Sequence, residues 1–196
     1  TDRSPNPEVI SISTQVLQPL ETKSRLLQLD GDGDYVRIQR SDKLSLANTV
    51  TLECWLNRGT HDQWELIVGN GGGWSNKGYH IMSSPQGGVR FELQSETTKS
   101  ILDSNTIIDD QWYHIAATYN GNTMSIYING YLDVSMEHLN GMNSQETDLG
   151  IAFGLYSSYD GSYFEGQIDE VRVWNIARSE EEIRASMNQP LVGTES

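Results

Sequence analysis

Apolar and polar residues alternate over short stretches along most of the chain, and clusters of glycine, asparagine and aspartate separate these stretches. The clearest case spans residues 112–133, where every second residue is apolar on both sides of Asn120-Gly121. An Asn-Gly pair between two alternating runs is a strong signal for a β-hairpin. We therefore expect a hairpin here, followed by a second turn at Asn129-Gly130.

Similar runs predict further short strands, and one segment favours a helix. The helix is expected after Ser179, because Ser179 and Glu182 have the spacing of a capping box and Pro190 ends the segment. The order of these elements predicts an all-β domain: a two-sheet antiparallel jelly-roll sandwich with one short C-terminal helix. The expected strands cover residues 26–30, 35–38, 49–56, 65–68, 78–82, 89–93, 150–154 and 167–174.

The two ends of the chain lack this regular pattern. Residues 1–25 are interpreted as a leader, in which residues 9–17 have the composition of one added strand. Residues 26–190 are expected to form the domain, and residues 191–196 a linker to a following domain. Because the chain begins at Thr1 rather than at methionine, we expect it to be one piece of a larger protein.

Acidic residues outnumber basic ones by 27 to 13, which gives a formal net charge of -14 over 196 residues. Such a chain repels phosphate backbones, so nucleic-acid binding is not expected, and strongly anionic ligands are disfavoured. The longest stretch without charged residues, 111–132, contains two Asn-Gly turns, so we expect no insertion into a membrane. The only cysteine, Cys54, lies in an apolar run and is expected to be buried.

Four segments of the chain, in this order, resemble a laminin G-like domain of the concanavalin A-like lectin/glucanase superfamily, in its bacterial multi-domain form. The resemblance covers about residues 26–190 and implies an extracellular or cell-surface location beside other domains of one parent chain. We expect Trp55, Trp112 and Trp174 to fill the space between the two sheets. The segments are Leu27-Gln28-Leu29-Asp30-Gly31-Asp32-Gly33-Asp34-Tyr35-Val36, Val50-Thr51-Leu52-Glu53-Cys54-Trp55, Trp112-Tyr113-His114-Ile115-Ala116 with Tyr127-Ile128-Asn129-Gly130, and Ile168-Asp169-Glu170-Val171-Arg172-Val173-Trp174-Asn175.

Three aspartates, Asp30, Asp32 and Asp34, alternate with glycine. Their carboxylates, together with backbone carbonyls, suit Ca²⁺, which takes six or more oxygen ligands. The alternative is a polar turn without metal, in which glycine and aspartate serve the backbone. The resemblance implies a structural cation where the N-terminal segment meets the last long strand, with Asp169 as a ligand beside Asp30 and Asp32. Calcium is therefore an expected structural cofactor.

Glu92 and Glu96 fall on one face of the strand that begins at Val89. Retaining glucanases of the same superfamily carry a Glu-x-Asp-x-Glu strand, and here the middle position is Gln94 instead of aspartate. Alternating charges are also typical of the solvated face of a sheet. We therefore interpret this strand as non-catalytic and expect that the chain is not an enzyme.

Aromatic and polar residues gather in the segments between strands. Aromatic rings stack on the C–H faces of sugars, and aspartate or asparagine side chains hold the hydroxyl groups. The alternative is that the rings lie against the edge of a sheet or serve a protein interface. The candidate ligand-binding residues are Trp74, Tyr156, Tyr159, Asp160 and Tyr163.

The sequence therefore favours a non-catalytic recognition module that binds glycan or protein and belongs to a larger surface or secreted protein. Two alternatives stay open: a structural or adhesion repeat without a ligand of its own and, with less support, a glycoside hydrolase of the same superfamily.

Overall fold

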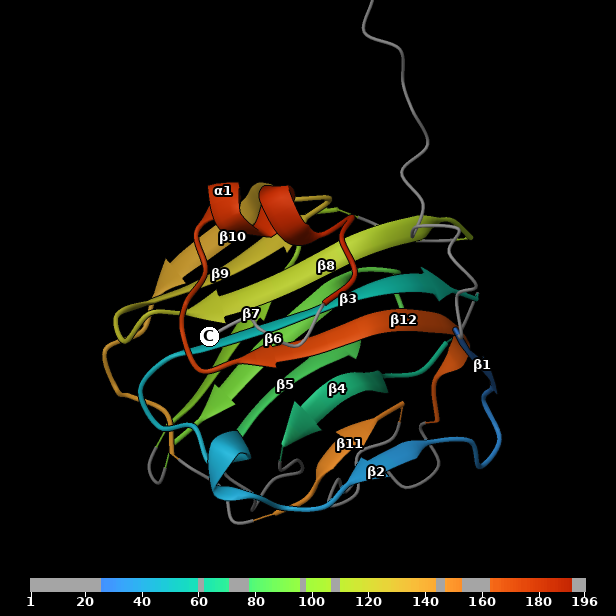
Figure 1. Cartoon of the computed structure of the whole chain (residues 1–196), viewed down its shortest axis with the longest axis horizontal. Coiled ribbons are helices and arrows are strands. Elements are labelled where there is room, and N and C mark those ends of the chain that lie inside the picture. The colour runs from blue at the N-terminus through green and yellow to red at the C-terminus, as the bar shows by residue number, and fades with distance from the viewer. Residues whose placement is uncertain are drawn as a thin grey trace, which may run out of the picture.

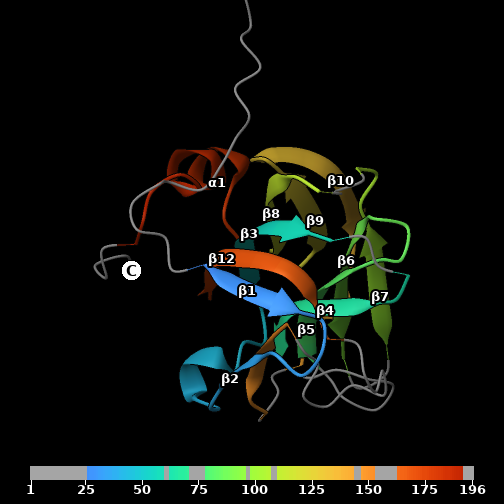
Figure 2. The same cartoon turned by 90° about the vertical axis from the view of Figure 1, so that its right-hand side faces the viewer.

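The computed structural model describes residues 26–59, 62–70, 78–95, 98–106, 110–143, 147–152 and 163–191. In these ranges the chain forms two six-stranded antiparallel sheets that stack as a sandwich (Figure 1, Figure 2). The predicted all-β jelly-roll architecture is confirmed. The first sheet has the order β1-β12-β3-β8-β9-β10, and the second has the order β2-β11-β4-β5-β6-β7.

The strands of the first sheet are β1 (Leu27–Asp30), β12 (Glu165–Trp174), β3 (Val50–Arg58), β8 (Trp112–Tyr119), β9 (Thr123–Ile128) and β10 (Tyr131–Glu137). Those of the second are β2 (Val36–Ile38), β11 (Leu149–Ile151), β4 (Glu65–Asn70), β5 (Gly78–Ser83), β6 (Val89–Gln94) and β7 (Lys99–Asp103). A 3-10 turn (Asp42–Leu44) and the helix α1 (Glu180–Ser186) complete the described elements.

The core lies between the sheets and is built from alternate residues of each strand. On β3, Leu52, Cys54 and Leu56 point inward and are fully buried. On β6, Phe91 and Leu93 meet them from the other sheet. Cys54 is buried as predicted, and burial raises the pKa of its thiol to about 12, so it acts as a small apolar residue.

The predicted hairpin is confirmed as β8–β9, in which Ile115 pairs with Ile128. Its turn is held by Asn120, whose Oδ1 accepts hydrogen bonds from the backbone N–H groups of Asn122 and Thr123 at 2.9 and 2.8 Å. The second predicted turn joins β9 to β10. Its residues Asn129 and Gly130 have φ values of 52° and 78°, the left-handed conformation that Asn-Gly adopts in tight hairpins.

Trp55 does not lie between the sheets, and the prediction of that placement is wrong. It alternates with Cys54 and Leu56, so its ring points to the outer face of the first sheet. There it is 1% exposed, because α1 covers it, and its Nε1 donates to the backbone oxygen of Met187 at 2.7 Å. By the same alternation Trp112 and Trp174 also belong to this outer face, and both are only partly buried.

The predicted helix start is confirmed. Ser179 Oγ accepts from the Glu182 N–H at 3.2 Å, and the Glu182 carboxylate accepts from the Ser179 N–H at 2.7 Å, which forms the full capping box. Ile183, on the inner side of α1, is fully buried and packs the helix onto the sheet. Among the described residues, no helix is long and apolar enough to cross a membrane.

Candidate functional site

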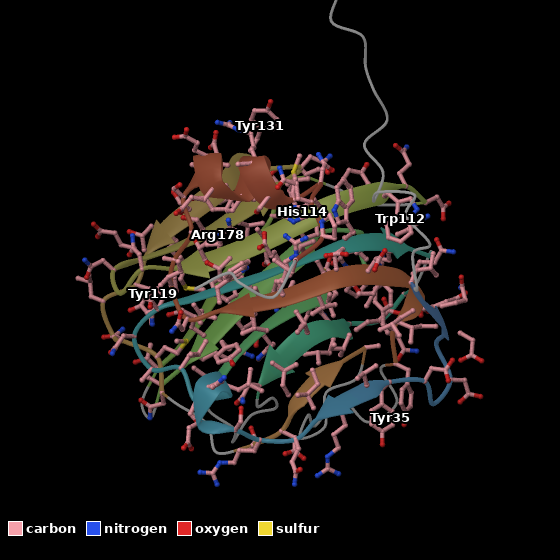
Figure 3. The ribbon with its side chains drawn as sticks, viewed as in Figure 1. Tyr35, Trp112, His114, Tyr119, Tyr131 and Arg178 are labelled. Atoms are coloured by element: carbon pink, nitrogen blue, oxygen red, sulfur yellow. The ribbon has the colours of Figure 1, made fainter. Side chains whose placement is uncertain are left out.

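Two tyrosine rings from distant parts of the chain meet where β2 and β12 begin. The ring centroids of Tyr35 and Tyr163 lie 6.4 Å apart, and the ring planes are tilted by 38°. This separation is within the range of favourable aromatic pairs. Tyr35 is 46% exposed and Tyr163 is partly buried. Figure 3 shows Tyr35 beside β2, far from Tyr131, which lies beside α1. We call Tyr35 and Tyr163 the tyrosine pair.

The backbone after Tyr163 is held firmly, and this fixes its position. Phe164 is fully buried, and its N–H donates to the Ala152 oxygen at 2.9 Å. The N–H of Glu165 donates to Glu65 Oε1 at 3.2 Å, and Glu65 is itself fully buried. Tyr163 therefore sits directly before a well-anchored strand.

A tight acidic turn precedes Tyr35, the other member of the tyrosine pair. Asp30 Oδ1 accepts a hydrogen bond from the Asp32 N–H at 2.9 Å, which closes an Asx turn. Gly31 lies within this turn and Gly33 follows it, with φ values of 79° and 88°, a conformation that favours glycine. The chain then enters β2, where Val36 pairs with Ile151 of β11.

One of the predicted ligand-binding residues, Tyr163, thus lies with its ring beside that of Tyr35. Trp74, Tyr156, Tyr159 and Asp160 lie outside the described residues. Tyr35, the neighbour of Tyr163, is not among the candidate residues predicted from the sequence. The available signal was its position directly after the acidic turn, at the start of a short alternating run.

The carboxylates predicted to share a calcium ion do not come together. Asp30 pairs with Glu165, whereas Asp169 lies one position beyond Ile168, the partner of Leu27 at the other end of β1. Four strand positions separate the two, about 13 Å. Among the described residues, no three Asp, Glu, His or Cys side chains are grouped so that they could hold a metal ion. A site formed jointly by Asp30, Asp32 and Asp169 therefore does not fit this arrangement.

Asp169 has a visible structural partner instead. Its Oδ1 accepts from the N–H of Glu170 at 2.8 Å, and Glu170 has a φ of 50° where the β12–β3 register shifts. Past this β-bulge, Arg172 donates to Glu170 at 2.8 Å and to the Ser186 oxygen at 3.1 Å. The acidic pair thus shapes the bulge that lets Arg172 reach the end of α1.

Glu92 lies on the outer face of the second sheet, among basic side chains. His80 Nε2 is 2.8 Å from Glu92 Oε2, Lys99 Nζ is 2.7 Å from the same oxygen, and an Arg90 nitrogen is 3.7 Å from Oε1. The carboxylate is nevertheless only 2% exposed. Burial alone would raise the pKa of Glu92, but the hydrogen bonds and charges of His80 and Lys99 outweigh it and lower the pKa to about 2.

This environment does not suit a general acid. A glycosidase acid needs a raised pKa, and Glu92 has a lowered one. Glu96, the other carboxylate of the pair considered above, lies outside the described residues. Next to Glu92, the Arg90 guanidinium lies 3.9 Å from the centroid of the Trp64 ring and donates to both Asp103 oxygens at 2.6 and 2.9 Å. The cluster is an ion-pair network on a sheet face.

The two stacked six-stranded sheets define a jelly-roll domain. A family model described as "Concanavalin A-like lectin/glucanases superfamily", of laminin G type, matches residues 30–184, so the chain belongs to this family. Among curated proteins, mouse pappalysin-1 is 29% identical over 182 residues, and human pappalysin-1 is 27% identical. These matches cover 84% of the chain but 11% of each pappalysin, so the chain spans about a tenth of these relatives.

Solved structures share the fold at low sequence identity. A SAP-like pentraxin from Limulus polyphemus matches with a TM-score of 0.62 and 15% identity, covering 81% of this chain and 79% of the pentraxin. A putative carbohydrate-binding protein from Bacteroides ovatus matches with a TM-score of 0.63 and 18% identity, covering 82% of this chain and 48% of that protein. The ligand-binding domain of botulinum neurotoxin serotype D was solved with N-acetylneuraminic acid. It matches with a TM-score of 0.62 and 19% identity, covering 82% of this chain and 40% of the neurotoxin chain.

Proposed function

We propose that this chain is a non-catalytic recognition module that binds glycan, as one domain of a larger secreted or cell-surface protein. The observation that carries the proposal is the tyrosine pair, two neighbouring rings just before β2 and β12, one of them 46% exposed. Aromatic rings present flat apolar surfaces that stack against the C–H faces of sugars, and the polar groups around them orient the hydroxyls.

The comparisons support this choice of ligand class. Two of the similar structures are described as a "putative carbohydrate binding protein" and as a domain in complex with N-acetylneuraminic acid. A third comes from work on botulinum neurotoxin type C, whose cell entry is described as dependent on two ganglioside molecules. These descriptions concern those proteins, and they make a glycan the first ligand class to test here.

The absence of catalysis is part of the proposal. It is supported by the lowered pKa of Glu92 and by its close contacts with His80 and Lys99, which hold the carboxylate as a charged partner in a network. A carboxylate that cannot take up a proton near neutral pH cannot protonate a leaving group. We therefore expect no product from any glycan that the domain binds.

A glycan array probed with the isolated chain tests the proposal. We expect binding to a restricted set of glycans, weakened about tenfold by Tyr163→Ala or Tyr35→Ala, since the loss of one stacking ring costs on the order of 1–2 kcal/mol. Tyr131→Ala is the matched control, because Tyr131 is 61% exposed and lies against Arg184 of α1, away from the pair.

Two results would contradict the proposal. Full affinity in the Tyr35→Ala/Tyr163→Ala double variant would move the site elsewhere. Silence on the array, together with an unchanged melting temperature of both variants, would favour a structural or adhesion repeat without a glycan ligand.

A further inference from the structure

The charges around the tyrosine pair are mostly of one sign. Asp30, Asp32 and Asp34 are exposed and lie in the turn that ends at Tyr35. Glu165, also exposed, pairs with Asp30 across the β1–β12 ladder and follows Tyr163 by two residues. Three carboxylates thus lie in the segment that leads to Tyr35, whereas the Glu165 side chain lies beside Gly59.

Arg37, the described basic residue nearest in sequence to Tyr35, offsets little of this negative charge. Arg37 donates from its guanidinium to the carboxylate of Asp148, so its charge is already paired. Asp148 is held in place by a second bond, from the Arg40 N–H at 2.7 Å. Because Arg37 and Asp148 neutralise each other, the remaining charge near the two rings is mainly that of carboxylates.

We propose that the tyrosine pair selects sugars by charge, so that it binds uncharged and amino sugars and rejects acidic ones such as sialic acids and uronic acids. This inference rests on the proposed function, and it names the substrate class of that site. A sugar carboxylate stacked on Tyr35 would lie near Asp34, the adjacent residue. In water each carboxylate about 7 Å away weakens the binding of an anion roughly threefold.

The expected size of the selection follows from these charges. The three aspartates of the turn, partly screened by salt, should weaken the binding of an acidic glycan by up to about tenfold relative to its neutral counterpart at low ionic strength. An amino sugar should bind at least as well as its N-acetylated form, because its ammonium group is attracted instead. The selection differs from that of the neurotoxin domain of the same fold, which was solved with N-acetylneuraminic acid.

The experiment uses matched glycans and a matched pair of charge variants. The glycans are galactose-terminated oligosaccharides with and without a terminal sialic acid, and chitin oligosaccharides with and without their acetyl groups. The variant is Asp32→Asn/Asp34→Asn, which spares the Asx-turn carboxylate of Asp30. The control is Asp103→Asn, which removes the same kind of charge from β7, at the far edge of the second sheet.

We expect the affinity ratio of neutral to sialylated glycan to fall several-fold in the double variant and at high salt, and to stay unchanged in Asp103→Asn. Wild-type protein that binds sialylated glycans as well as neutral ones through Tyr163 would overturn the charge selection while the proposed function stands. A ratio unchanged in a folded double variant would overturn it too. If no glycan depends on Tyr163, the proposed function fails and the selection with it.

Discussion

Arg178 donates a hydrogen bond to Glu53 Oε1 at 2.9 Å, although the two residues are 125 positions apart in the chain. Glu53 is fully buried on the outer face of the first sheet, and Trp174 Nε1 donates to the same oxygen at 2.5 Å. His114 Nε2 lies 3.4 Å from the other oxygen. This network ties the segment before α1 to the sheet; Figure 3 shows Arg178 and His114 beneath the helix.

Loss of the Glu53 carboxylate should therefore destabilise the domain strongly. Burial alone would raise the pKa of Glu53, but His114 and Arg178 outweigh it and hold the pKa below its usual value. Glu53→Gln leaves the partly buried Arg178 against a neutral side chain, and removal of one partner of a buried ion pair costs about 3–5 kcal/mol. Urea unfolding followed by tryptophan fluorescence measures the change.

Glu180→Gln is the matched control for this prediction. It breaks the surface ion pair that Arg184 forms with Glu180 one helical turn away, which contributes about 0.3–0.5 kcal/mol. The amide oxygen of the new glutamine can still accept the hydrogen bond that the Leu132 N–H donates to Glu180. Equal effects of the two substitutions on the free energy of unfolding would contradict the structural role assigned to Glu53.

Glu92 should make stability depend on pH in the acid range. Its pKa is about 2 in the folded chain against 4.5 for the free side chain, so the folded state favours the ionised form. Its contribution is complete above pH 4.5 and is lost as the pH falls from about 4.5 to about 2. The difference in pKa corresponds to on the order of 3 kcal/mol.

Glu92→Gln should therefore be less stable than wild type at pH 7, and the two should converge near pH 2. Thermal unfolding across this pH range measures the difference, with Glu181→Gln on the exposed side of α1 as the control for a lost charge. A difference that stays constant from pH 7 to pH 2 would show that Glu92 does not titrate as its surroundings require.

The fold was predictable because its signals are local. Alternation identified most strands, and the Asn-Gly turns and the Ser179–Glu182 capping box identified the hairpin and the helix start. Alternation shows which residues share a face but not what covers that face. Trp55 was therefore assigned to the space between the sheets, although α1 buries it from outside.

The site was less predictable because its residues meet only in the folded chain. Tyr163 was identified from the aromatic composition of its segment, whereas its neighbour Tyr35 lies just before β2, far away in sequence. Asp30 and Asp169 failed as a pair for the opposite reason. The family resemblance places them on neighbouring strands, but the register of β1 against β12 sets them at opposite ends.

Gly69 should not accept a side chain. A Cβ atom at this position would lie 2.2 Å from Cβ of His80 and 2.9 Å from its Cα. Since part of this contact is backbone, the neighbour cannot rotate away, and overpacking of this kind costs about 1–3 kcal/mol. We expect Gly69→Ala to lower stability by that amount in chemical denaturation. In the control Gly59→Ala, the nearest atoms are flexible side-chain atoms of Glu165 at 3.6 Å, and a comparable loss there would contradict the argument.

The register of β1 against β12 determines which carboxylates could share a calcium ion. A cation that binds only the native state at a hundredfold its Kd adds about 2.7 kcal/mol. If Asp32 and Asp169 held one ion, either substitution alone would abolish this gain, and the double variant would lose no more. Asp30, which holds the Asp32 N–H, pairs with Glu165, four positions from Asp169, so the effects of the two substitutions should instead be independent.

The measurement is the free energy of unfolding in millimolar CaCl2 minus that in EDTA, for wild type, Asp32→Asn, Asp169→Asn and the double variant. We expect the calcium-dependent change in the double variant to equal the sum of the two single changes within about 0.5 kcal/mol. Asp169→Asn alone should leave the calcium dependence as it is in wild type, because its carboxylate serves the Glu170 bulge. A calcium response that vanishes equally in both single variants would show that the two carboxylates share an ion after all.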